Sequence, residues 1–192
     1  NYTMDKKLKI SICILAGLVC FYLYDNSKQS SYQENYVEIF KFDHSKISKV
    51  MINNNNDWIE LEKNELSWKI NGHDSLVIKE TAIDKFFNET LLVKINTLSV
   101  STNPEDLTIY SLDSTRGIKL ILLDSEGEAL SNSIFGISPS NYYSNFYKDA
   151  DSQSVYKTNS NIINYLTTSV QYWGESPKQD IPDSTVSSPS DL

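Results

Sequence analysis

The sequence contains little of the material from which most catalytic and metal sites are built. Its 192 residues include 2 cysteines, 2 histidines and 6 glycines. It has no glycine-rich phosphate loop, no Gly-x-Ser-x-Gly turn and no zinc-type spacing of cysteine and histidine. We therefore expect a protein that is not an enzyme, with no catalytic residue, no cofactor and no metal site.

Positive charge is also scarce. The chain has 17 lysines and arginines against 25 aspartates and glutamates, a net charge of −8. Three of its lysines, Lys6, Lys7 and Lys9, lie close together near residue 1, so the remainder is more acidic still. A surface of that sign repels nucleic acid and anionic lipid head groups, and we expect no nucleic-acid partner.

One hydrophobic segment, residues 8–24, stands out. It is close to the lower length limit for a membrane-spanning helix, which needs about 20 residues, so both a membrane anchor and a signal peptide fit it. The residues at its end lack the small side chains of a cleavage site, which favours an uncleaved anchor. The residues expected to contact lipid are Leu8, Ile10, Ile12, Ile14, Leu15, Leu18, Val19, Phe21 and Leu23.

The lysines before this segment predict its orientation. Positive residues remain on the cytoplasmic side of a bacterial inner membrane, which places residues 1–7 in the cytoplasm and everything after the anchor in the periplasm. Residues 25–35 are polar and read as a spacer, residues 36–173 as one extracytoplasmic domain, and residues 174–192, rich in Pro, Ser and Asp, as a flexible tail.

The first half of the domain predicts a β-meander followed by a helix. Apolar residues alternate over residues 49–52, 58–61 and 66–70, with polar turns between them. Thr81 and Asp84 have the spacing of a helix cap. The side chains that follow at helical spacing, on the face expected to cover the meander, are Ala82, Ile83, Phe86, Phe87 and Leu91.

The second half predicts more strands and another helix. Strands are expected at residues 97–101, 118–123, 130–137, 142–148 and 154–158, with hairpin turns at 124–128 and 149–152, and a closing helix at 161–172. The predicted fold class is α+β: a single transmembrane helix, then a mainly antiparallel β domain with two helices. Each half has the order strands then helix, which suggests two repeats.

Several short motifs occur in a shared order over residues 46–172. They are Trp68 and Ile70, the segment near Ala82, Leu107 with residues 110–113, Phe135-Gly136, Tyr142-Tyr143 and Val155-Tyr156. In this order the chain resembles the bacterial family called domain of unknown function 4340, although Ser111 stands where that family usually has glycine, and Thr115 lies where it often has proline. The resemblance implies an anchored extracytoplasmic domain, sometimes found beside gliding-motility-type transporter components, with no established catalytic residues to carry over.

The few candidates for chemistry have simpler structural interpretations. His44 and His73 each stand next to an acid and a serine, but neighbouring residues cannot readily adopt the geometry of a catalytic triad. The acidic runs at 124–128 and 149–151 lack the spacing of a calcium loop, so hairpin turns are favoured.

Aromatic residues carry the functional hypothesis. Tyr143, Tyr147 and Trp173 are the candidates for contact with a partner. The function expected is that of a non-catalytic, membrane-anchored accessory or scaffold subunit, whose partners are membrane lipid at residues 8–24 and the other subunits of a membrane complex. The alternative is a periplasmic ligand-binding or auxiliary component of an ABC-transporter or gliding-motility-type system, which would need a concave pocket.

Overall fold

The computed structural model describes residues 12, 14–23, 35–65, 67–139 and 141–177. The chain divides into two units, residues 1–35 and residues 36–192. The described part of the first unit is helical at residue 12 and over residues 14–23.

The prediction of a transmembrane anchor is contradicted. Among the residues that the structure describes, no helix is both long and apolar enough to cross a bilayer. Two further predictions depended on this anchor, the single-pass topology and the location in the inner membrane. Both are contradicted with it. Of the predicted lipid contacts, Leu8 and Ile10 lie outside the described residues.

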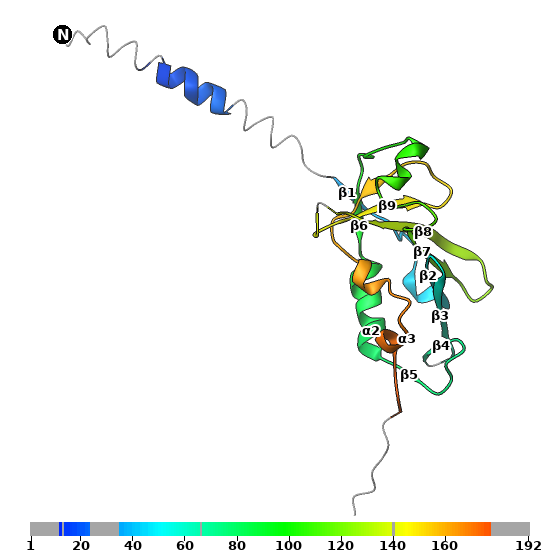
Figure 1. Ribbon diagram of the computed structural model, residues 1–192. Coiled ribbons are helices and arrows are strands. Elements are labelled where there is room, and N and C mark those ends of the chain that lie inside the picture. Colours follow the sequence, from blue (N-terminus) through cyan, green and yellow to red (C-terminus); the bar gives the residue numbers. More distant parts are fainter. Residues whose placement is uncertain (1–11, 13, 24–34, 66, 140, 178–192) are drawn as a thin grey trace, which may run out of the picture. The chain divides into compact units, whose positions relative to one another are not determined.

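A seven-stranded antiparallel sheet dominates the second unit, in the order β10-β9-β8-β7-β2-β3-β4 (Figure 1). Two meanders meet where β2 pairs with β7, from Lys49 opposite Leu123 to Asn54 opposite Ile118. The meander predicted over residues 49–70 is confirmed, and so are the two hairpins of the second half. The strands are β2 (Lys49–Asn54), β3 (Asp57–Lys63), β4 (Trp68–Ile70), β7 (Ile118–Leu123), β8 (Ala129–Ile137), β9 (Asn145–Asp149) and β10 (Tyr156–Lys157).

Alternation of side chains gives this sheet an inner and an outer face. On β7 the side chains of Ile118, Leu120 and Leu122 are buried, while those between them are half-exposed. Successive side chains of a strand point to opposite faces, so the buried set defines the inner face. The main core lies against that face.

Short helices cover the inner face. The helix α2 (Glu80–Lys85) continues as a π-helical turn, η2 (Phe86–Thr90), and lies beside α3 (Val170–Trp173) (Figure 1). The rings of Phe86 and Trp173 are both fully buried, with their centroids 6.0 Å apart. The remaining short elements are η1 (His44–Lys46), η3 (Pro104–Thr108), η4 (Ile163–Tyr165) and two strand pairs, β1 (Tyr36–Glu38) with β6 (Lys94–Asn96) and β5 (Val77–Ile78) with β11 (Gly174–Glu175).

The α+β prediction overstated the helices, because the described domain is mostly β-sheet. The closing helix expected at 161–172 is wrong: η4 ends at Tyr165 and α3 begins at Val170. Between them the Thr167 hydroxyl accepts a hydrogen bond from the backbone of Ser169, and the Thr167 carbonyl accepts one from the Trp173 indole at 2.7 Å. Side-chain hydrogen bonds of this kind compete with helix formation.

Two smaller predictions also differ from the structure. Thr81 does not cap α2, which begins one residue earlier, at Glu80, after Lys79. The expected strand at 97–101 is reduced to a single bridge between Ser101 and Val155, and β6 lies just before that range.

Candidate functional site

The two histidines belong to different elements: His44 begins η1, and His73 follows β4. The His44 ring is 3.1 Å from the carbonyl oxygen of Phe40 and packs edge-on against Phe42. His73 is exposed in the loop after β4. Within the described ranges, no three His, Cys, Asp or Glu side chains could hold a metal ion together.

The acidic runs build turns, as predicted. The Asp124 carboxylate accepts hydrogen bonds from the backbone amides of Glu126 and Glu128, both at 2.9 Å. The Asp149 carboxylate accepts one from the Asp151 amide at 3.0 Å. These oxygens organise the hairpins that join β7 to β8 and β9 to β10.

The three candidates for partner contact have very different environments. Tyr147 is 7% exposed and packs on Phe135, and Trp173 is 0% exposed in the core. Tyr143 is 86% exposed and lies in the turn between β8 and β9. Of the three, Tyr143 alone presents its ring to an incoming molecule.

The segment 101–117 covers one half of the sheet's outer face. It is anchored at Ser101, whose backbone pairs with Val155. It then passes so close to β8 that a Cβ atom on Gly136 would collide with the carbonyl oxygen of Tyr110. The Tyr110 ring packs against Phe146 of β9, with centroids 4.6 Å apart. Glycine at position 136 therefore permits this close approach.

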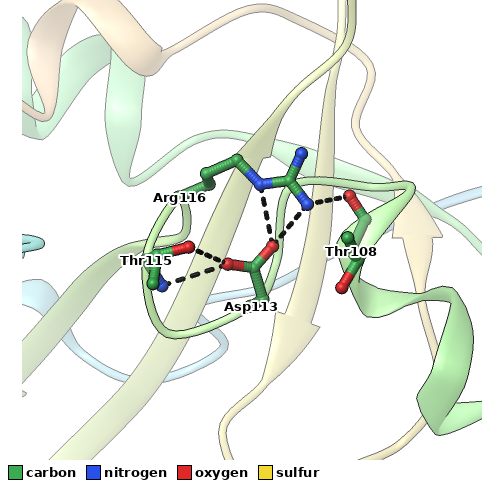
Figure 2. Close-up of polar contacts among 4 residues, drawn as sticks. All are labelled: Thr108, Asp113, Thr115 and Arg116. Carbon is green, nitrogen blue, oxygen red and sulfur yellow. Dashed lines mark hydrogen bonds and ion pairs between the residues drawn. The ribbon is translucent and has the colours of Figure 1, made fainter.

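A polar clamp fixes the end of the covering segment (Figure 2). The Asp113 carboxylate accepts hydrogen bonds from the hydroxyl and amide of Thr115 and from Arg116, whose Nη2 lies 2.7 Å away. The Arg116 guanidinium also donates to the carbonyl of Thr108. The bonds from Thr115 and Arg116 hold the pKa of the Asp113 carboxyl well below its usual range. Each of these bonds joins two residues of the same segment, which indicates a structural role for the clamp.

Lys148 belongs to the covered half of the outer face. Its side chain alternates with that of Tyr147, which faces the core, so Lys148 points to the outer face. It is nonetheless 5% exposed, and its ammonium donates to the carbonyls of Asp149 and Ala150, each at 3.0 Å. Burial lowers the pKa of this ammonium, against the opposing pull of nearby carboxylates.

The other half of the outer face is open around Trp58. This residue is 60% exposed on β3, beside a hollow of about 460 Å³ whose lining includes Met51, Lys119 and Ile121. Glu60 borders the same hollow and forms an ion pair with Lys49 at 2.7 Å. The open half therefore offers an apolar floor with charged groups around it.

A larger open cleft of about 820 Å³ lies at the sheet edge, and Trp58 lines this one too. Its walls come from the β2–β3 turn, the loop around His73 and the segment 167–171. The strand β4 pairs with β3 from Leu61 to Lys63, so the first residues of β3 face this cleft without a neighbouring strand among the described residues. Trp58 is the side chain that the two hollows share.

The sequence contained a signal for this site. Trp58 alternates with Ile59 and shares its face of β3 with Glu60 and Glu62, so a large aromatic ring stands in a polar row. An apolar ring on a face that is otherwise polar indicates a binding surface. The prediction of a strand at residues 58–61 did not include this binding surface.

Comparisons with models of protein families, with curated proteins and with solved structures find no match for this chain. The resemblance to domain of unknown function 4340 stays a prediction.

Proposed function

We propose that the chain is a non-catalytic accessory or scaffold protein that binds another protein through the turn between β8 and β9. One observation carries the proposal: Tyr142 and Tyr143, adjacent in this turn, are 82% and 86% exposed. Exposed tyrosines are enriched in protein interfaces and often provide much of the binding energy. Ile137, the last residue of β8 before this turn, is also half-exposed.

Two hydrogen bonds hold the backbone of the two exposed tyrosines. The Asn161 side chain donates to the Tyr142 carbonyl at 2.9 Å. The Asn141 side chain accepts from the Tyr143 amide, also at 2.9 Å. Backbone that is already fixed at these two residues loses less conformational entropy on binding, which favours affinity.

Charge points to a different protein as the partner, rather than a second copy of this chain. Two copies, each with a net charge of −8, would repel each other over long range. A partner with an apolar pocket inside a neutral or basic surface would complement the exposed tyrosines and the net negative charge of the chain.

The test compares three forms of the tagged full chain, purified from cells that make it naturally. The wild type and a Leu98→Ser control, which removes a 70% exposed side chain outside the turn, should retain one stoichiometric partner. A Tyr142→Ser, Tyr143→Ser double variant should lose it. The purified partner should then bind the wild type at least about tenfold more tightly than the double variant in calorimetry.

Two results would overturn the proposal. One is a wild-type chain that elutes alone as a monomer. The other is a partner that the double variant and the Leu98→Ser control retain equally, because binding would then not depend on the tyrosines.

A further inference from the structure

We propose that the cleft beside Trp58 is a binding site for a neutral saccharide chain. The site is distinct from the tyrosine turn and does not depend on the function proposed above. Its volume of about 820 Å³ lies within the range of roughly 300–1,000 Å³ typical of small-molecule sites.

Trp58 supplies a platform on which a sugar ring can stack. The indole is 60% exposed, yet it stands on a strand that is hydrogen-bonded to β2 through the register Asn53 opposite Trp58. The face of an aromatic ring carries partial negative charge. The C–H bonds on one side of a pyranose carry partial positive charge, so the two surfaces attract each other while both lose contact with water.

Polar side chains surround this platform. Asn56, Asp57 and His73 line the cleft, and their side chains make no hydrogen bond to another described residue. In the segment 167–171, which also lines the cleft, the Ser169 hydroxyl donates to the Gln171 side chain at 3.2 Å, which leaves the Gln171 amide nitrogen as a donor. Amides, hydroxyls and a carboxylate can pair with sugar hydroxyls, because together they provide both hydrogen-bond donors and acceptors.

The same lining disfavours other ligand classes. No lysine or arginine is among the described residues that line the cleft, and its Asp57 would repel a phosphate or another anion. A wholly apolar ligand would take water from the polar groups without replacing their hydrogen bonds, which costs free energy. A ligand with hydroxyl groups and one apolar face satisfies both requirements.

The position of Trp58 indicates a chain of sugars rather than one. The Trp58 side chain lines both the edge cleft and the hollow on the outer face. A linear ligand stacked on this ring would therefore enter both. The hollow on the outer face adds Asn53 and Lys119 as polar contacts.

The test uses the full chain and four neutral hexasaccharides as probes: cellohexaose, chitohexaose, maltohexaose and laminarihexaose. Calorimetry should detect binding of at least one of them. Tryptophan emission should shift to shorter wavelength on binding, because the exposed indole loses water. Trp58→Ala should weaken binding by about tenfold or more, and Trp58→Phe, which keeps an aromatic face, should recover part of the loss.

The matched control is the Tyr142→Ser, Tyr143→Ser variant, which should bind the saccharide as the wild type does. Failure of all four probes to bind overturns the proposal. So does equal affinity of Trp58→Ala and wild type, or binding restricted to anionic polysaccharides such as polygalacturonate. None of these results bears on the protein partner, whose binding is measured at the other site.

Discussion

The outer face of the sheet has two halves that differ in what lies on them. One row of paired side chains crosses both, from Trp58 through Asn53, Lys119 and Ile134 to Lys148. Exposure along the row falls from 60% at Trp58 to 5% at Lys148. Over β8 and β9 the segment 101–117 covers the face, and over β2 and β3 it stays open.

The difference shows how this fold separates stability from binding. In the covered half, polar groups find partners inside the chain and a glycine lets two backbones approach closely. In the open half, an indole and several polar side chains are left for a ligand. Substitutions should therefore affect unfolding in the covered half and binding in the open half.

The largest effect on stability is expected from Leu112→Ala. Leu112 belongs to the covering segment and is 2% exposed, outside the main core cluster. Removing a buried leucine side chain costs about 2–4 kcal/mol of unfolding free energy, because apolar contacts are lost and a cavity remains. Urea denaturation measures this. The matched change in the open half, Ile121→Ala, should cost less than about 1.5 kcal/mol, since Ile121 is half-exposed; equal losses would contradict the contrast.

A somewhat smaller effect is expected from Gly136→Ala. The added methyl group would meet the Tyr110 carbonyl and the Ser111 backbone, so the covering segment must move. Overpacking of this kind costs about 1–3 kcal/mol. Faster amide hydrogen exchange at Leu112, whose N–H donates to the Leu107 carbonyl, would show that the segment has loosened. Unchanged exchange together with unchanged stability would mean that the segment does not rest on β8.

Much of the sheet is readable from sequence, because alternation and turn residues report it directly. The strand at residues 118–123 was predicted with its observed bounds, since Ile118, Leu120 and Leu122 alternate with less buried residues. The helices were harder. The apolar spacing of residues 161–172 fits a helix, but Thr167 and Ser169 use their hydroxyl groups in local hydrogen bonds instead.

The candidate sites were less predictable than the sheet. Tyr143 was identified as a partner contact, but Tyr147 and Trp173 were selected with it, and composition alone cannot show that the chain buries them. The cleft at Trp58 depends on segments more than 100 residues apart in sequence, residues 56–58 and 167–171. No local pattern indicates that these segments meet.

The titration of Lys148 gives a third test of the difference between the two halves, with a smaller expected effect on stability. Burial lowers the pKa of its ammonium in the folded chain below the ordinary value of 10.5, so the unfolded chain binds more protons between the two values. Stability contributed by this group should therefore rise with pH across that window. Lys148→Met should flatten the rise in urea unfolding measured from pH 7 to 10.5.

The difference between the pH curves of the wild type and Lys148→Met isolates the contribution of Lys148 to stability. Tyr147 and Tyr172, whose hydroxyl pKa values are raised by burial, titrate in both proteins. Lys119→Met, in the same row over the open half, is the control and should leave the slope unchanged. A slope that the two variants alter equally would mean that the covering segment does not desolvate Lys148.

The smallest effect on stability is expected where the effect on binding is greatest. Trp58→Ser removes the largest exposed side chain of the open half, but its ring makes no aromatic contact in the described structure and is 60% in solvent. The change should alter the unfolding free energy by no more than about 0.5 kcal/mol. If Trp58→Ser instead destabilises the chain as much as Leu112→Ala, the indole is a packing residue. The open half would then be a second part of the core, and the proposal that its hollows bind a ligand would be contradicted.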